Sequence, residues 1–129
     1  MTEQAARFIH AELMAEHGGL PGPSREGTLE AALARPRHIY YYSPKPPTIE
    51  HLAAAYGFAI GAGHCFPDGN KRLALAVMDV FLQLNGRELT VIEANAVLTM
   101  QDVAAGNLSE EELAGWVREN SAPLGSTST

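Results

Sequence analysis

The sequence lacks the features that mark several classes of protein. It has one cysteine, Cys65, among 129 residues, so an internal disulfide is excluded and a cytoplasmic setting is expected. No apolar run approaches the roughly 18–20 residues of a membrane span, and residues 1–10 do not resemble a secretory signal. We therefore expect neither membrane insertion nor secretion. The length and the ordinary share of hydrophobic residues, 46%, indicate a single globular domain.

Positive charge is also scarce. Nine lysines and arginines oppose fifteen acidic residues, and a net charge of −6 disfavours direct binding of nucleic acid through a broad positive surface. The basic residues are unevenly placed, because residues 35–72 have five of them against two acidic residues. This basic segment suggests a site for a small anion, although an uneven distribution by chance explains it equally well.

Periodic apolar residues and capping signals predict a mostly helical chain. Two capping boxes are expected, Thr90 with Glu93 and Ser109 with Glu112, and the proline- and glycine-rich residues 20–27 are expected to form a loop. The predicted helices cover residues 3–17, 49–62, 70–84 and 110–119, with a short helix capped by Thr28 that runs to about Ala34. A further helix, capped by Thr90, is expected to carry Ala94, Val97 and Leu98.

One segment departs from the helical pattern. Residues 38–47, HIYYYSPKPP, combine aromatic residues that favour strands with prolines, which predicts a strand or a small hairpin. The predicted fold class is therefore all-α with a small β-like segment. A single domain is expected over residues 1–120, followed by a flexible Ser/Thr-rich tail over 121–129.

Residues 64–72, HCFPDGNKR, concentrate polar side chains at the start of the most apolar predicted helix. The first turn of a helix presents unpaired N–H groups and a partial positive charge. Gly69 allows a ligand to approach the backbone closely, and three side chains add donors around the same point. We therefore predict an anion site, most naturally for phosphate, whose added donors are Asn70, Lys71 and Arg72.

Asp68 and His64 extend this prediction toward catalysis. A carboxylate beside a phosphate is repelled unless a divalent ion such as Mg²⁺ lies between them, so Asp68 is a candidate metal ligand; a helix cap is the alternative. An imidazole titrates near neutral pH, so His64 is a candidate general base; a histidine hydrogen-bonded at a helix end is the alternative. Cys65 is expected to be a small core residue, the spacing does not match a phosphate loop of the Walker type, and it disfavours a structural zinc site.

The nine-residue motif resembles the H-x-F-x-D-[AG]-N-[GK]-R signature of the Fic/Doc family, and more closely its death-on-curing (Doc) branch. The resemblance covers nearly the whole chain. It implies a compact helical bundle with the motif on a loop that enters a central helix. It also includes the stretches IHAELMAEHGG, LEAALARPR, LAAAYGFAIGAGH, ALAVMDVFLQLNG and AAGNLSEEELAGWV.

The resemblance also implies roles for the site residues. His64 would be the general base for a target hydroxyl, Asp68 would hold Mg²⁺ bound to ATP, and Arg72 would join them in catalysis. Residues 38–47 fall where we expect the family's flap, which aligns a target polypeptide through strand-like contacts. The residues implied to bind the nucleotide phosphates are Gly69, Asn70, Lys71 and Arg72.

Two departures bear on the reaction. Family members that transfer AMP typically have glycine where this chain has Lys71, and an arginine where it has Leu75. Both departures match the Doc branch and favour transfer of the γ-phosphoryl group of ATP to a Ser/Thr hydroxyl, which is protein kinase chemistry. AMP transfer and a catalytically silent, partner-binding protein are the alternatives.

The resemblance further implies the toxin of a type II toxin–antitoxin system, with a translation factor such as elongation factor Tu as the target. Some family members inhibit themselves through an internal [ST]-x-x-x-E-[GN] helix, but here Gly22 and Gly115 stand where serine or threonine is required. We therefore expect inhibition in trans by an antitoxin segment that binds an apolar groove between helices.

Overall fold

The computed structural model describes residues 1–20 and 22–125, and these residues form six helices and two short strands. The all-α fold class is confirmed, and no helix in the described part is long and apolar enough to cross a membrane. In chain order the elements are α1 (Glu3–His17), α2 (Thr28–Tyr42), α3 (Ile49–Gly63), α4 (Asn70–Leu84), β1 (Arg87–Leu89), α5 (Glu93–Ala104), α6 (Glu110–Glu119) and β2 (Ser121–Pro123).

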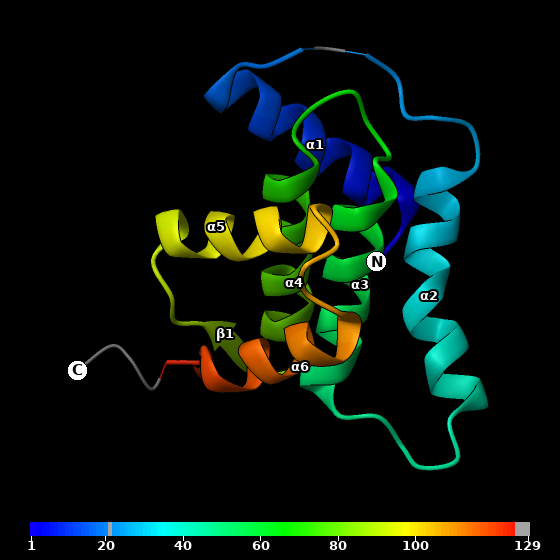
Figure 1. Cartoon of the computed structure of the whole chain (residues 1–129), viewed down its shortest axis with the longest axis vertical. Helices are drawn as coiled ribbons and strands as arrows, with labels where there is room; N and C mark the ends of the chain where they lie inside the picture. Colours follow the sequence, from blue (N-terminus) through cyan, green and yellow to red (C-terminus); the bar gives the residue numbers. More distant parts are fainter. Residues whose placement is uncertain (21, 126–129) are drawn as a thin grey trace.

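Helix α3 lies at the centre of the molecule. It packs against α4, α6 and α2, while α1 and α5 lie against α4 (Figure 1). Three consecutive residues, Ala53, Ala54 and Ala55, are fully buried, which requires neighbours on several faces of the helix. The motif follows directly after this helix and leads into α4, so the two best-packed helices fix it from both sides.

Local signals predicted several helix ends correctly. Helix α1 has the predicted bounds, and Thr48 caps α3 by accepting a hydrogen bond from the His51 amide (3.1 Å). The capping box of α6 is present, with Ser109 Oγ accepting from the Glu112 amide (3.1 Å) and Glu112 Oε1 from the Ser109 amide (3.0 Å). The box predicted at Thr90 is wrong, because α5 begins after Ile92 and the Thr90 amide donates to the Asn120 carbonyl instead (2.8 Å).

Helix α2 is longer than predicted. The expected end before Pro36 is wrong, since the helix continues through this proline to Tyr42 and begins after Gly27. A proline inside a helix removes one hydrogen bond. Pro36 is itself buried, and so are Leu29 and Leu33 on the same helix, so apolar burial against α3 outweighs the lost bond.

The strand or hairpin predicted over residues 38–47 is wrong as well. Residues 38–42 form the last turn of α2, and residues 43–47 have no regular strand or helix. Ile39 continues the buried face of the helix, whereas the tyrosines that suggested a strand are more than half exposed. Helical packing therefore decides the conformation here, and strand propensity does not. The exposed tyrosines are Tyr40, Tyr41 and Tyr42.

The C-terminal segment also differs from its prediction. Residues 121–123, predicted to belong to a flexible tail, form β2, which pairs antiparallel with β1 in the register Arg87↔Pro123 and Leu89↔Ser121. Arg87 ties this small sheet to α3, because its Nε lies 3.1 Å from Glu50 Oε1 and its Nη2 donates to the Ser121 carbonyl (3.1 Å). Residues 126–129 of the predicted tail lie outside the described residues.

Candidate nucleotide-binding site

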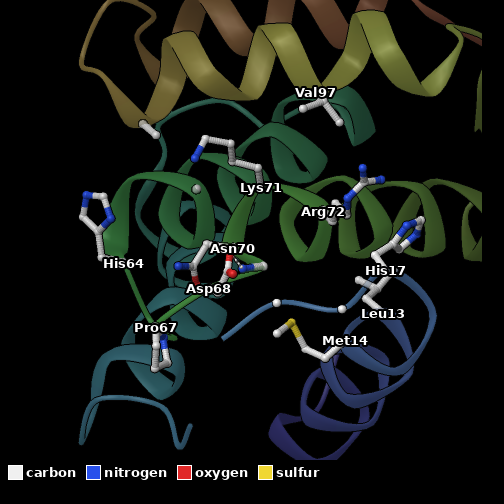
Figure 2. A pocket seen from close by; sticks show the side chains of 15 residues that line it. Leu13, Met14, His17, His64, Pro67, Asp68, Asn70, Lys71, Arg72 and Val97 are labelled. Atoms are coloured by element: carbon white, nitrogen blue, oxygen red, sulfur yellow. Dashed lines mark hydrogen bonds between the residues drawn. The ribbon is translucent and has the colours of Figure 1, made fainter. Parts of the chain in front are cut away.

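All residues of the motif except the buried Cys65 and Phe66 line one cavity of about 470 Å³. Its walls come from the end of α1 and the glycines after it, from the end of α3, from the start of α4 and from α5. In Figure 2, His64 lies at one side of the cavity and Arg72 and His17 at the other, with Asp68 and Asn70 between them. The structure thus brings every predicted site residue to a single place: His64, Asp68, Gly69, Asn70, Lys71 and Arg72.

His64 ends α3 in an unusual backbone conformation. Its φ of 50° and ψ of 49° lie in the left-handed region, and it is the single non-glycine residue with positive φ in the described part of the chain. This conformation costs a residue with a β-carbon roughly 1–2 kcal/mol. The side chain is exposed to the cavity, and its ring makes no hydrogen bond with another described residue. The imidazole nitrogens are therefore free to accept a proton from a bound group.

Arg25 holds the backbone on which His64 sits. Its amide donates to the Cys65 carbonyl (2.8 Å), its Nε to the His64 carbonyl (3.3 Å) and its Nη2 to the Gly63 carbonyl (2.9 Å). Sequence reasoning missed this residue, because it lies in a proline- and glycine-rich loop 39 positions before His64 and no local pattern connects the two.

The Asp68 carboxylate is held by two backbone amides. The Leu20 amide donates to Oδ2 (3.0 Å) and the Gly69 amide donates to Oδ1 (2.8 Å). These two hydrogen bonds lower the pKa of Asp68 below its ordinary value, with a smaller contribution from the nearby Lys71 ammonium. Asp68 is not the helix cap that was the alternative prediction, because Gly69 is the capping residue of α4 and no side chain caps this helix. Asp68 is therefore an ionised carboxylate at the edge of the cavity.

A buried histidine and an asparagine fix the shape of the motif loop. His10 of α1 stacks on Phe66 (3.7 Å between ring centroids), and its Nε2–H donates to the Asp68 carbonyl (2.9 Å). The Asn70 side chain accepts from the Phe66 amide (2.9 Å) and donates to the Phe66 carbonyl (2.8 Å). These two hydrogen bonds occupy the Asn70 side chain, so Asn70 can contact an anion only through its backbone N–H.

The first turn of α4 faces the cavity with free donors. Gly69 caps the helix with φ 82°, and the backbone amides of the next three residues, 70–72, have no acceptor among the described residues. A β-carbon at position 69 would lie 3.0 Å from Met14 Sδ and 3.2 Å from His10 Nε2, so the conformation favours glycine and a larger residue would make these two side chains shift by a few tenths of an ångström. This arrangement is a helix N-terminus open to an anion.

The two cations of the motif differ in their surroundings. Lys71 lines the cavity without an ion-pair partner among the described residues, whereas Arg72 Nη1 pairs with Glu93 Oε1 at the start of α5. Arg72 also lines a neighbouring cavity of about 260 Å³, whose walls are mostly apolar. Leu75, one turn further along α4, is 8% exposed and lines this second cavity.

The segment expected to act as the flap lies elsewhere. No residue of 38–47 lines the motif cavity; residues 43–47 instead border a separate cavity at the first turn of α3. The fifteen residues of α3 separate the two ends by about 20 Å (Figure 1). The segment that does reach the motif comprises residues 18–20 and 22–27, with contacts through Gly19, Leu20 and Arg25. The adjacent Gly18 and Gly19 were the sequence signal that could have indicated a close approach of this backbone to the motif.

The donor set fits Mg²⁺ in one particular way. No group of three or more histidine, cysteine, aspartate or glutamate side chains in the described part could hold a metal ion by itself. Asp68 is a single ionised carboxylate, and each of its oxygens accepts one backbone hydrogen bond and retains a lone pair. Mg²⁺ is commonly held by one or two carboxylates together with substrate phosphates and water. Asp68 suits that mode and not a site made by protein alone.

Comparison with known proteins agrees with the motif. The model of the Fic/DOC family matches residues 1–82. The chain is 34% identical to the protein kinase doc of Escherichia phage P1 over 110 residues, which are 85% of this chain and 86% of that protein. It is 40% identical to the toxin Doc of Mycolicibacterium smegmatis over 63 residues, 49% of this chain and 48% of that one. With its family model matched over more than half its length, the chain belongs to the Fic/DOC family.

Proposed function

We propose that this protein is a protein kinase of the Doc type, which transfers the γ-phosphoryl group of ATP to a Ser/Thr hydroxyl of a target protein. The observation that supports this proposal best is the convergence on one cavity of a free imidazole, an ionised carboxylate and an open helix N-terminus. Phosphoryl transfer requires positioning and neutralisation of charge more than covalent chemistry, and these groups supply both.

The site residues have separate roles in the proposed reaction. The target hydroxyl oxygen forms a bond to the γ-phosphorus, the bond from that phosphorus to the β–γ bridging oxygen breaks, and ADP leaves. The hydroxyl proton passes to the His64 imidazole, whose ring is free to accept it. The amides at the start of α4 and the Lys71 ammonium stabilise the charge on the phosphate oxygens. Held by Asp68 and the phosphates, Mg²⁺ would neutralise part of that charge.

Two features favour γ-phosphoryl transfer over AMP transfer. Lys71 occupies space beside the cavity that a glycine would leave open to a phosphate. Leu75, in the place of the second arginine of AMP-transferring members, is buried and offers no cation for the far end of a triphosphate. Both features support a nucleotide bound with its γ-phosphate toward His64.

The biological role that we propose is that of a toxin inhibited in trans. One relative is named a toxin and another a protein kinase. The mostly apolar cavity of about 260 Å³ beside Arg72, lined by Leu13, Leu75 and Val91 among others, suits the apolar face of an antitoxin segment. We propose a cytoplasmic setting and a translation factor such as elongation factor Tu as the target, because these follow from the resemblance.

The test uses ATP labelled in two ways. The protein is incubated with Mg²⁺, purified elongation factor Tu and ATP labelled either at the γ-phosphate or in the adenine ring. We expect label on the target from γ-labelled ATP alone. Label that arrives with adenine would replace the proposal by AMP transfer. If neither label moves while His64→Ala remains as toxic in cells as the parent protein, the chain acts through partner binding and the kinase proposal fails.

A further inference from the structure

We propose that Arg25 is a positioning residue for His64, acting from residues 18–20 and 22–27, which are together called the bracing loop here. Arg25 does not line the motif cavity, so it is not in place to touch a nucleotide. It contacts instead the backbone carbonyls that end α3. The catalytic part of this inference rests on the proposed function, while the structural part does not.

Three hydrogen bonds from one residue converge on the turn that includes His64. The guanidinium donates to the carbonyls of Gly63 (2.9 Å) and His64 (3.3 Å), and the Arg25 amide donates to the Cys65 carbonyl (2.8 Å). The last carbonyls of a helix have no partner within the helix, and the helix dipole makes that end negative. A guanidinium is suited to this position, because its fork of N–H groups reaches two carbonyls at once.

The conformation of His64 is the reason that bracing matters. Its left-handed backbone is unfavourable for a residue with a β-carbon, so the turn persists only where its surroundings hold it. No hydrogen bond of the imidazole to another described residue holds the side chain. The backbone therefore sets the direction of the ring. When the two carbonyls lose Arg25, the turn relaxes and the imidazole samples several directions.

The bracing loop holds the other end of the motif as well. The Leu20 amide donates to Asp68 Oδ2 (3.0 Å), so the same loop contacts both the candidate base and the candidate metal ligand. The loop is itself anchored, because Thr28 donates twice to the Arg25 carbonyl (2.7 and 3.1 Å). The bracing loop thus contacts the motif both at His64 and at Asp68.

The kinetic test compares Arg25→Gln with a matched control. Arg7→Gln removes a guanidinium that contacts the same loop through Ser24 but does not reach the end of α3. We expect Arg25→Gln to lower kcat by about tenfold to a hundredfold, a loss typical of a misplaced catalytic group, with KM for ATP changed less than about twofold. Arg25→Lys, which can reach one carbonyl, should recover part of kcat. Arg7→Gln should retain the parent kcat.

The structural test does not depend on activity. The His64 imidazole is followed by nuclear magnetic resonance, after assignment of its signal with His64→Ala. We expect a shifted or broadened His64 signal in Arg25→Gln and an unchanged one in Arg7→Gln, with both variants shown to be folded by circular dichroism.

An unchanged His64 signal in Arg25→Gln overturns the inference, whether or not the parent transfers phosphate. A parent without transfer but with the expected signals overturns the proposed function alone. A fall in kcat matched by an equal rise in KM would assign Arg25 to nucleotide binding and overturn the positioning role.

Discussion

The two ends of α3 offer cavities of nearly equal size but different chemistry. The motif cavity measures about 470 Å³ and the one at the connection between α2 and α3 about 480 Å³. At the motif end, α4 presents three backbone amides without an acceptor among the described residues. At the other end the wall contains three prolines, which have no N–H to offer: Pro44, Pro46 and Pro47.

The charged side chains also differ between the two ends of α3. Near the connection between α2 and α3, His51 lies 3.6 Å from Glu110, which also accepts a hydrogen bond from Arg35 (3.1 Å). Lys45 lines the cavity at that end, and the acidic Glu111 lines the same cavity. Volume therefore does not distinguish the candidate site from the cavity at the other end of α3. The distinguishing property is the convergence of unpaired donors with an ionised carboxylate.

The largest expected difference between the two ends of α3 concerns His64 and His51. His64→Ala removes the candidate base, and general bases contribute about 10²- to 10⁴-fold, so γ-phosphoryl transfer should fall by that factor. His51→Ala, at the opposite end of α3, should leave transfer within about twofold of the parent. Label transfer measures activity, and calorimetric titration with a non-hydrolysable ATP analogue should give similar affinities for both variants. A strongly weakened affinity in His64→Ala would contradict its role as a base.

The next effect concerns the two lysines. Lys71→Ala removes a cation from the amide end of α4, and hydrogen bonds to charged groups are worth about 1.5–3 kcal/mol, so affinity for the ATP analogue should fall about tenfold or more. Lys45→Ala removes a cation from the proline-lined cavity and should leave affinity unchanged. Equal losses in the two variants, measured by the same titration, would mean that the nucleotide senses overall charge instead of one cavity.

A smaller effect separates the two glycines that cap helices in the left-handed region. Gly27→Ala, at φ 77°, meets no atom within 4 Å and should cost only the conformational penalty of about 1–2 kcal/mol. Gly69→Ala, at φ 82°, adds contacts with Met14 and His10 and should lower the free energy of unfolding further. Urea denaturation compares them. Equal losses would show that the packing around the motif adapts freely to a β-carbon.

The smallest effect is a dependence on pH. The pKa of Asp68 is lowered in the folded protein by the amides of Leu20 and Gly69, so the folded state gains stability above the ordinary aspartate pKa of 3.8. That contribution is lost as the pH falls below 3.8 and through the lowered value. The stability difference between the parent and Asp68→Asn should therefore shrink as acid is added. Thermal unfolding of the parent and of Asp68→Asn across a series of pH values measures this difference.

Sequence reasoning succeeded where neighbouring residues decide the outcome. The capping box at Ser109, the cap at Thr48 and the start of α4 at Asn70 depend on residues within one turn, and all three are confirmed. Helix α2 could not be predicted in full, because the burial that carries it past Pro36 comes from packing against α3. The same limit explains why the motif was found whole while its supports, Arg25 and His10, were missed: both act across more than thirty residues of chain.

The short pairing of β1 with β2 has a practical consequence for the choice of chain ends. A chain cut after Asn120 would lose β2, and with it the Ser121 carbonyl and hydroxyl that accept from Arg87. Arg87 would then keep only Glu50, its ion-pair partner on α3, beneath a newly exposed edge of β1. Truncations and C-terminal fusions that aim to preserve the fold should therefore retain residues up to at least Gly125, whose amide donates to Glu88.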